Sequence, residues 1–202
     1  MCSMSAHEDC IATPSMKIAC VLSEGYEDSE FRIPFDRLEA AGHEVTVIGA
    51  EKGETLKGKA GKESVDADAA IDEVKAASFD ALLIPGGHSP DQLRADVRFV
   101  EFTKAFSAKP IFAVCHGPQL LITAGMVEGR TMTAWQTIQL DLKNAGATVV
   151  DKEVCVDGNL VTSRKPQDLE AFARESIRIL AAGGKAATPG KSVKSKQASQ
   201  SS

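Results

Sequence analysis

The chain has 202 residues, of which 43% are hydrophobic and 25% are charged, and this composition predicts one globular domain with a sizeable core. The formal net charge of −5 argues against nucleic acid as a partner. No apolar run reaches the length of a bilayer-spanning segment, and the first residues argue against a secretory signal. Five scattered cysteines without a Cys-x-x-Cys pair indicate a reducing, cytoplasmic setting, and no metal, cofactor or disulfide framework is predicted.

The first half of the chain alternates apolar runs with helical spacing. Residues 17–22 predict a strand, and 28–41 predict a helix that Gly42 ends. A second strand is expected over 45–48. The Lys- and Gly-rich stretch 51–64 then predicts a short hairpin or loop.

The same alternation continues in the second half. Buried strands are predicted at 79–84 and 110–114, with a helix at 97–107 between them and another at 119–124. The remaining expected elements are a helix over 137–145, strands around Asp157-Gly158-Asn159, and a last amphipathic helix over 169–182.

This order predicts an α/β fold. We expect a flavodoxin-like, doubly wound and mostly parallel sheet with helices on both faces, because the central strands are continuously apolar. The domain is expected to span 16–182, between a flexible extension at 1–15 and a disordered, Gly-, Ser- and Lys-rich tail at 183–202.

Cys115 is the candidate nucleophile. An apolar strand ends at this residue and Gly117-Pro118 opens the next helix, the layout of a nucleophile elbow. A thiol at a helix N-terminus is favoured as thiolate, the form that attacks carbonyls and reacts with peroxide. The competing interpretation is a buried core cysteine, which holds for Cys20 and Cys155 within their strands.

Candidate partners follow the carboxyl ends of other strands. His116 reaches the thiol only if the turn bends sharply, and His88 could line the same crevice. Asp91 is the nearest acid for a histidine, although it could equally cap a helix. Gly86 and Gly87 suit an oxyanion site or a plain tight turn.

Four acids, Glu24, Glu27, Asp28 and Glu30, follow the first strand. Most should be solvated or start a helix. One of them, buried and protonated beside the thiol, could donate a hydrogen bond to the sulfur.

With these residues together, the stretch from about 17 to 180 resembles the PfpI family of peptidase- and deglycase-like proteins, within the class I glutamine-amidotransferase-like superfamily. Four motifs carry the resemblance: residues 26–30, 83–87, 113–118, and 157–159 with 162–164.

The resemblance implies roles for these residues. Cys115 would be the nucleophile with His116 as its partner, and Glu27 would contact the sulfur. Gly86, Gly87 and the His116 amide would form the oxyanion site. Family members take a triad acid from a neighbouring subunit, and Asp91 stands at that position, which implies a homo-oligomer, either a dimer or a hexamer.

Two further positions are specific to this chain. His88 replaces the Arg expected there, and Trp135 stands where the family often has Tyr. Residues 163–168 lack the histidine of a Cys-His-Glu triad, so glutamine hydrolysis is not expected.

The expected function is a stress-protective cysteine hydrolase acting on small carbonyl compounds, glycated proteins or peptides. The alternative is a redox-sensing stress protein in which Cys115 is oxidised with little catalysis. A holdase chaperone is a third class, which no feature of the sequence specifically supports.

Overall fold

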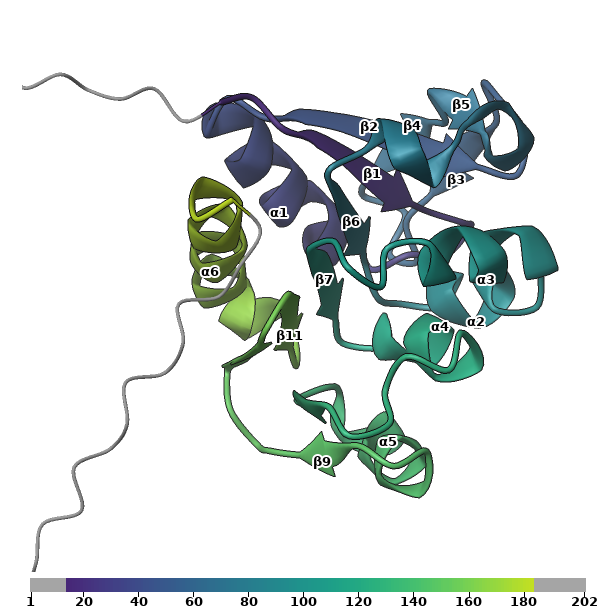
Figure 1. The fold of residues 1–202 in the computed structure, drawn as a ribbon. Helices are drawn as coiled ribbons and strands as arrows, with labels where there is room; N and C mark the ends of the chain where they lie inside the picture. Colours follow the sequence, from purple (N-terminus) through teal and green to yellow (C-terminus); the bar gives the residue numbers. More distant parts are fainter. Residues whose placement is uncertain (1–13, 184–202) are drawn as a thin grey trace, which may run out of the picture.

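The computed structural model describes residues 14–183, and its centre is a seven-stranded sheet (Figure 1). In spatial order the strands are β10 (Val154–Asp157), β11 (Leu160–Ser163), β7 (Ile111–Val114), β6 (Ala81–Ile84), β1 (Lys17–Val21), β2 (Glu44–Gly49) and β5 (Ala69–Ala70). Neighbours pair in parallel except β10 and β11, which form an antiparallel hairpin. The chain order reverses between β1 and β6, and α/β sheets hold their sites outside the carboxyl ends of strands at such a point.

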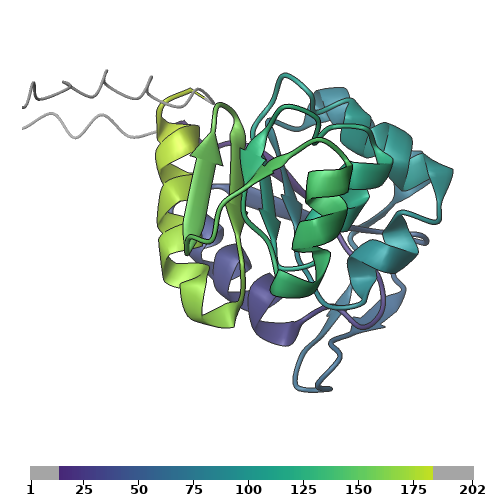
Figure 2. The same cartoon turned by 90° about the horizontal axis from the view of Figure 1, so that it is seen from below.

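Helices cover both faces of the sheet, as Figure 1 and the turned view in Figure 2 show. One face carries α1 (Asp28–Ala40) and α6 (Leu169–Ala181). The other carries α2 (Ser89–Leu93), α3 (Val97–Lys104), α4 (Pro118–Thr123) and α5 (Gln139–Asn144). The predicted fold class is therefore confirmed.

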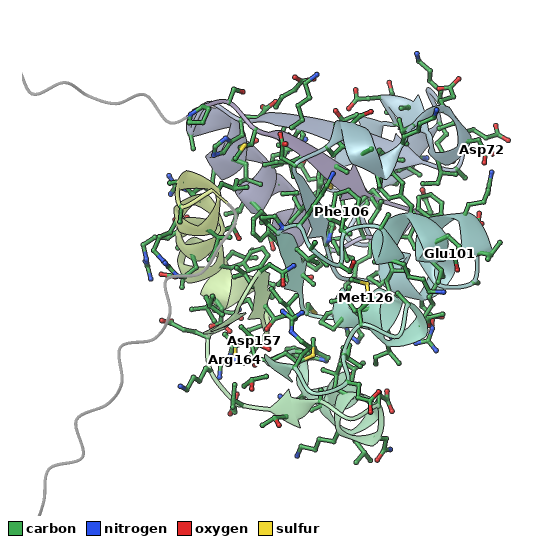
Figure 3. The ribbon with its side chains drawn as sticks, in the orientation of Figure 1. Asp72, Glu101, Phe106, Met126, Asp157 and Arg164 are labelled. Carbon is green, nitrogen blue, oxygen red and sulfur yellow. The ribbon has the colours of Figure 1, made fainter. Side chains whose placement is uncertain are left out.

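Each face of the sheet has its own apolar core because successive strand residues point to opposite sides. In β1, Ile18 and Cys20 pack under α1 and α6, whereas Ala19 and Val21 pack on the other side. Figure 3 places Phe106 near the middle of the molecule, where it is fully buried in the core on the side of the sheet that carries α2 to α5. These two cores fix the strands that carry the site.

Several short elements complete the chain. The predicted hairpin is confirmed as β3 (Thr55–Lys57) paired with β4 (Ser64–Asp66), and β8 (Thr131–Met132) pairs with β9 (Thr148–Val149). Single turns of 3-10 helix occur at η1 (Ile71–Glu73), η2 (Ala76–Ser78), η3 (Gln136–Ile138) and η4 (Pro166–Asp168). The sequence does not predict β5, β8 and α2, because elements of two to five residues show no measurable periodicity.

The first and last elements of the described chain are β1 and α6. The extension predicted at 1–15 and the tail predicted at 183–202 lie almost entirely outside the described residues. Within 14–183, no helix combines the length and the apolar character needed to cross a membrane.

Candidate active site

Cys115 lies on a strained turn between β7 and α4. Its φ is +60°, and among residues 14–183 it is the one non-glycine residue with a positive φ. This conformation costs about 1–2 kcal/mol for an L-residue, and such strain is typical of functional sites. The turn also requires Gly117, because a Cβ there would lie 2.5 Å from the carbonyl oxygen of Ile84. The predicted elbow is present.

The thiol of Cys115 faces the imidazole of the next residue. Its Sγ lies 3.3 Å from Nδ1 of His116, and Nε2 of His116 lies 3.4 Å from Oγ1 of Thr137. A proton on Nε2, shared with Thr137, leaves Nδ1 free to accept the thiol proton. Burial lowers the pKa of His116, so the ring is neutral and able to act as a base at neutral pH.

Glu30 supplies the carboxyl group that contacts this thiol. It lies in the first turn of α1 and is fully buried. Burial raises the pKa of Glu30 to about 8, while its contact with Cys115 acts in the opposite direction. Neither carboxyl oxygen has a hydrogen bond of ordinary geometry within the described chain, which leaves the thiol as the principal polar side chain beside it. Glu30 therefore holds its proton at neutral pH, next to the sulfur.

This arrangement corrects the expectation that Glu27 contacts the sulfur. Glu27 is the N-cap of α1, and its Oε2 accepts hydrogen bonds from the Glu30 amide at 2.9 Å and the Ser29 hydroxyl at 2.6 Å. Its side chain turns back over the start of the helix, as capping residues do. Glu30 lies on the buried side of α1 with Pro34 and Leu38, and this spacing of four was the sequence signal that could have identified it.

Backbone amides also converge on the thiol. Burial and the charge of Glu30 raise the pKa of Cys115, whereas the amides of His116 and Gly87 lower it. When the carboxyl group of Glu30 is protonated, its charge no longer raises this pKa; burial still does, and the two amides act against it. The amide of Gly86 is instead directed at Glu30. Gly87 has φ +82° and leaves no room for a Cβ against the Glu27 amide, so glycine is required there.

The sulfur opens into a hollow of about 200 Å³. Its lining residues are Glu27, Glu30, Lys59, Gly87, Cys115, His116, Trp135 and Pro166. Trp135 closes one side: its amide donates to the Cys115 carbonyl at 3.1 Å, and its ring centroid lies 6.4 Å from that of His116. A larger hollow of about 600 Å³ extends beyond Trp135 but does not contain the thiol.

His88 and Asp91 lie in a different hollow, of about 390 Å³, which shares Gly87 and His116 with the first. The side chain of Asp91 is 71% exposed and lies 3.7 Å from Arg94. Within the described chain it makes no hydrogen bond to His116, yet its charge raises the pKa of that ring. A single chain thus brings Asp91 near His116 without completing a triad.

Comparison with known proteins shows the family. The DJ-1/PfpI family model matches residues 16–179. The chain belongs to the DJ-1/PfpI family. General stress protein 18 of Bacillus subtilis (strain 168) is 59% identical over 81% of this chain and 97% of that protein. Protein/nucleic acid deglycase 2 of Escherichia coli (strain K12) is 57% identical over 83% of this chain and 99% of that protein.

Solved structures of DJ-1/PfpI proteins share the fold. Drosophila melanogaster DJ-1beta superposes with a TM-score of 0.74 at 28% identity, covering 84% of this chain and 97% of that one. A two-domain protein from Anabaena variabilis, with DJ-1/ThiJ/PfpI-like and ferritin-like domains, gives a TM-score of 0.81 at 41% identity over 84% of this chain. The present chain spans 49% of the length of that two-domain protein.

The last family motif is part of the scaffold in this DJ-1/PfpI chain. Asp157 accepts hydrogen bonds at 2.9 Å from Nε of Arg130 and from the Thr131 amide, which ties β8 to the β10–β11 hairpin. Arg164 is held by Asp168 at 2.8 Å and by Asp151 at 2.6 Å. Figure 3 labels Asp157 and Arg164 close to this hairpin. Neither residue lines the Cys115 hollow.

Three residues around the thiol were missing from the candidate site. The sequence marks Glu30 only as one of the acids after the first strand. No local pattern marks Lys59 or Thr137, because tertiary contacts place the turn that carries Lys59 and the 3-10 helix η3 that carries Thr137.

Proposed function

We propose that this DJ-1/PfpI protein is a cysteine-dependent hydrolase of small carbonyl compounds and their adducts, with a deglycase- or glyoxalase-like activity in stress protection. The observation that carries the proposal is the juxtaposition of Cys115, His116 and a buried, protonated Glu30 on a strained elbow. The similarity to proteins named deglycase 2 and general stress protein 18 supports the same class. The free thiols of Cys20, Cys115 and Cys155 suit a reducing cytoplasm, where we place the protein.

In this proposal the thiol proton of Cys115 passes to Nδ1 of His116, and the thiolate adds to an aldehyde carbon. A C–S bond forms while the carbonyl electron pair moves to oxygen, which takes a proton from Glu30. With methylglyoxal the resulting hemithioacetal isomerises to a thioester by proton shift between the two carbons. Water then cleaves the thioester, so methylglyoxal and water give lactate without an external oxidant.

The test replaces Cys115 with Ser and measures methylglyoxal loss, release of free thiols and amines from their glycated adducts, and peptide hydrolysis. We expect carbonyl turnover to fall to background, because a hydroxyl at this position is a far weaker nucleophile than a thiolate. Cys155→Ser is the control, since Cys155 lies in β10 outside the hollow. Unchanged turnover in Cys115→Ser would remove the proposed mechanism, and turnover of peptides alone would favour a peptidase.

A redox-sensing role is the second candidate, because the Gly87 and His116 amides that favour the thiolate would also stabilise an oxidised, anionic sulfur. Peroxide would be the oxidant: the thiolate takes one oxygen to give the sulfenate, and water leaves. Mass spectrometry after mild peroxide treatment distinguishes the roles. Selective oxidation of Cys115 in a protein that turns over no carbonyl compound would favour sensing.

We also propose that the protein is a homo-oligomer in which the carboxylate of Asp91 contacts the imidazole of His116 in a neighbouring copy. The support is its exposure at the rim of a hollow that already contains His116. An acid that held the imidazole would orient it and stabilise its charged form during proton transfer.

A further inference from the structure

Lys59 is a cation in the Cys115 hollow that the proposed chemistry does not use. It belongs to the exposed turn between β3 and β4, and it lines the hollow together with Cys115 and Trp135. Within the described residues, Lys59 forms no ion pair within 4.0 Å, unlike Arg32, which pairs with Asp36 and Glu63. Its positive charge acts on both Glu30 and His116, in each case in the direction that lowers the pKa, so it can also act on a ligand in the hollow.

The turn that carries Lys59 is held in place by α1. The buried carboxylate of Asp28 accepts hydrogen bonds at 2.9 Å from the amides of Ala60, Lys62 and Glu63. The amide of Lys59 donates to the Tyr26 carbonyl at 2.8 Å.

Close packing reinforces this anchor. A Cβ at Gly58 would lie 2.5 Å from Oδ1 of Asp28, so only glycine allows the turn to approach the helix this closely. The turn is thus fixed over the N-terminus of α1, and Lys59 with it.

The acids of the hollow do not neutralise this cation. Glu30 is protonated at neutral pH because burial raises its pKa. The carboxylate of Glu27 is engaged by the Glu30 amide and the Ser29 hydroxyl at the N-terminus of α1, whose dipole offsets its charge. The sulfur also lies under the Gly87 and His116 amides. Lys59 is therefore a cation of the hollow with which neither acid forms an ion pair.

We propose that Lys59 is a specificity-determining residue that binds a carboxylate of the substrate close to the reacting carbonyl. Among small carbonyl and acyl substrates, those that carry a carboxylate should then react faster than uncharged dicarbonyls such as methylglyoxal. This inference rests on the proposed function for the identity of the reacting atom. It further specifies that the preferred substrate is an anion, a property that neither the fold nor the thiol determines.

The test compares two alkylating reagents of similar size, anionic iodoacetate and neutral iodoacetamide. In both reactions the Cys115 sulfur bonds to the reagent CH₂ and iodide leaves, and peptide mass spectrometry gives the rate at Cys115 alone. The iodoacetate-to-iodoacetamide rate ratio is normalised to that of N-acetylcysteine. Any change in thiolate fraction affects both reagents equally and cancels in this ratio.

We expect Lys59→Met to lower the ratio by about three- to tenfold at low ionic strength, with the difference shrinking in 1 M salt. Lys59→Arg should keep most of the ratio because it keeps the charge. Lys62→Met is the matched control, since it removes the same charge from the same turn outside the hollow, and its ratio should stay near that of the wild type.

An equal ratio in the wild type and Lys59→Met would overturn the proposal, as would an equal loss in Lys62→Met. The measurement needs no turnover, so it can succeed or fail independently of the hydrolase proposal, which the Cys115→Ser assay decides. Thermal melting of each variant confirms that the compared proteins are folded.

Discussion

The Sγ of Cys115 lies 3.3 Å from Nδ1 of His116, although the two residues are consecutive in the chain. Adjacent side chains in a strand point to opposite faces. Here the positive φ of Cys115 bends the chain at the end of β7 and brings thiol and imidazole to the same side. The strained backbone at Cys115 is thus what brings the thiol and the imidazole together for proton transfer.

His116→Gln should lower kcat/KM for methylglyoxal by about 100-fold or more, because the thiol loses the neutral base that burial provides. His88→Gln is the comparison, since His88 lies in the neighbouring hollow, and its effect should be much smaller. Steady-state kinetics measure both variants. Equal losses would show that the short contact at 3.3 Å has no special role.

Glu30→Gln and Glu27→Gln distinguish the two candidate acids. Glu30→Gln removes the proton donor beside the sulfur, and we expect kcat/KM to fall by about 100-fold. Glu27→Gln keeps an oxygen acceptor at the N-cap, so its main effect should be a loss of stability below about 1 kcal/mol. Kinetics and thermal melting of the same samples give both quantities. A larger loss of kcat/KM in Glu27→Gln would show that Glu27, and not Glu30, is the proton donor beside the sulfur.

The stability of the protein should depend on pH through Glu30. Its pKa is raised from 4.5 to about 8 on folding, so between these values the folded chain binds more protons than the unfolded one. The contribution of Glu30 is complete below its unfolded pKa and is lost as the pH rises through about 8, by at most about 1.4 kcal/mol per pH unit.

Melting curves of the wild type and Glu30→Gln between pH 5.5 and 8 test this dependence, since the variant lacks the titrating group. The Tm difference, wild type minus variant, should decrease as the pH rises. A difference that stays constant or increases would show that Glu30 is already ionised in the folded protein.

Mixing two inactive variants tests whether Asp91 acts between subunits. Cys115→Ser chains keep Asp91, and Asp91→Asn chains keep Cys115. After subunit exchange, a mixed oligomer contains complete sites only if the acid comes from the neighbouring copy. We expect activity to reappear on mixing, as measured by methylglyoxal loss, with size-exclusion chromatography reporting the oligomeric state. Two inactive variants that stay inactive after verified exchange would contradict the proposal.

The sequence by itself determined the order of strands and helices and the elbow at Cys115. Continuously apolar strands indicate a sheet that helices cover on both faces. A cysteine between such a strand and Gly117-Pro118 indicates a turn from strand to helix. Local composition also predicted the β3–β4 hairpin, because Gly and Lys interrupt short extended segments there.

The tertiary structure decided which side chains meet the thiol. Whether Glu27 or Glu30 faces the sulfur depends on where α1 begins and which side it turns to the sheet, a difference of three residues that the acidic run leaves open. Lys59 enters the hollow only because Asp28 and Tyr26 hold a distant turn over α1. The position of Lys59 is set by packing between segments far apart in the chain, and residue spacing within one segment cannot predict it.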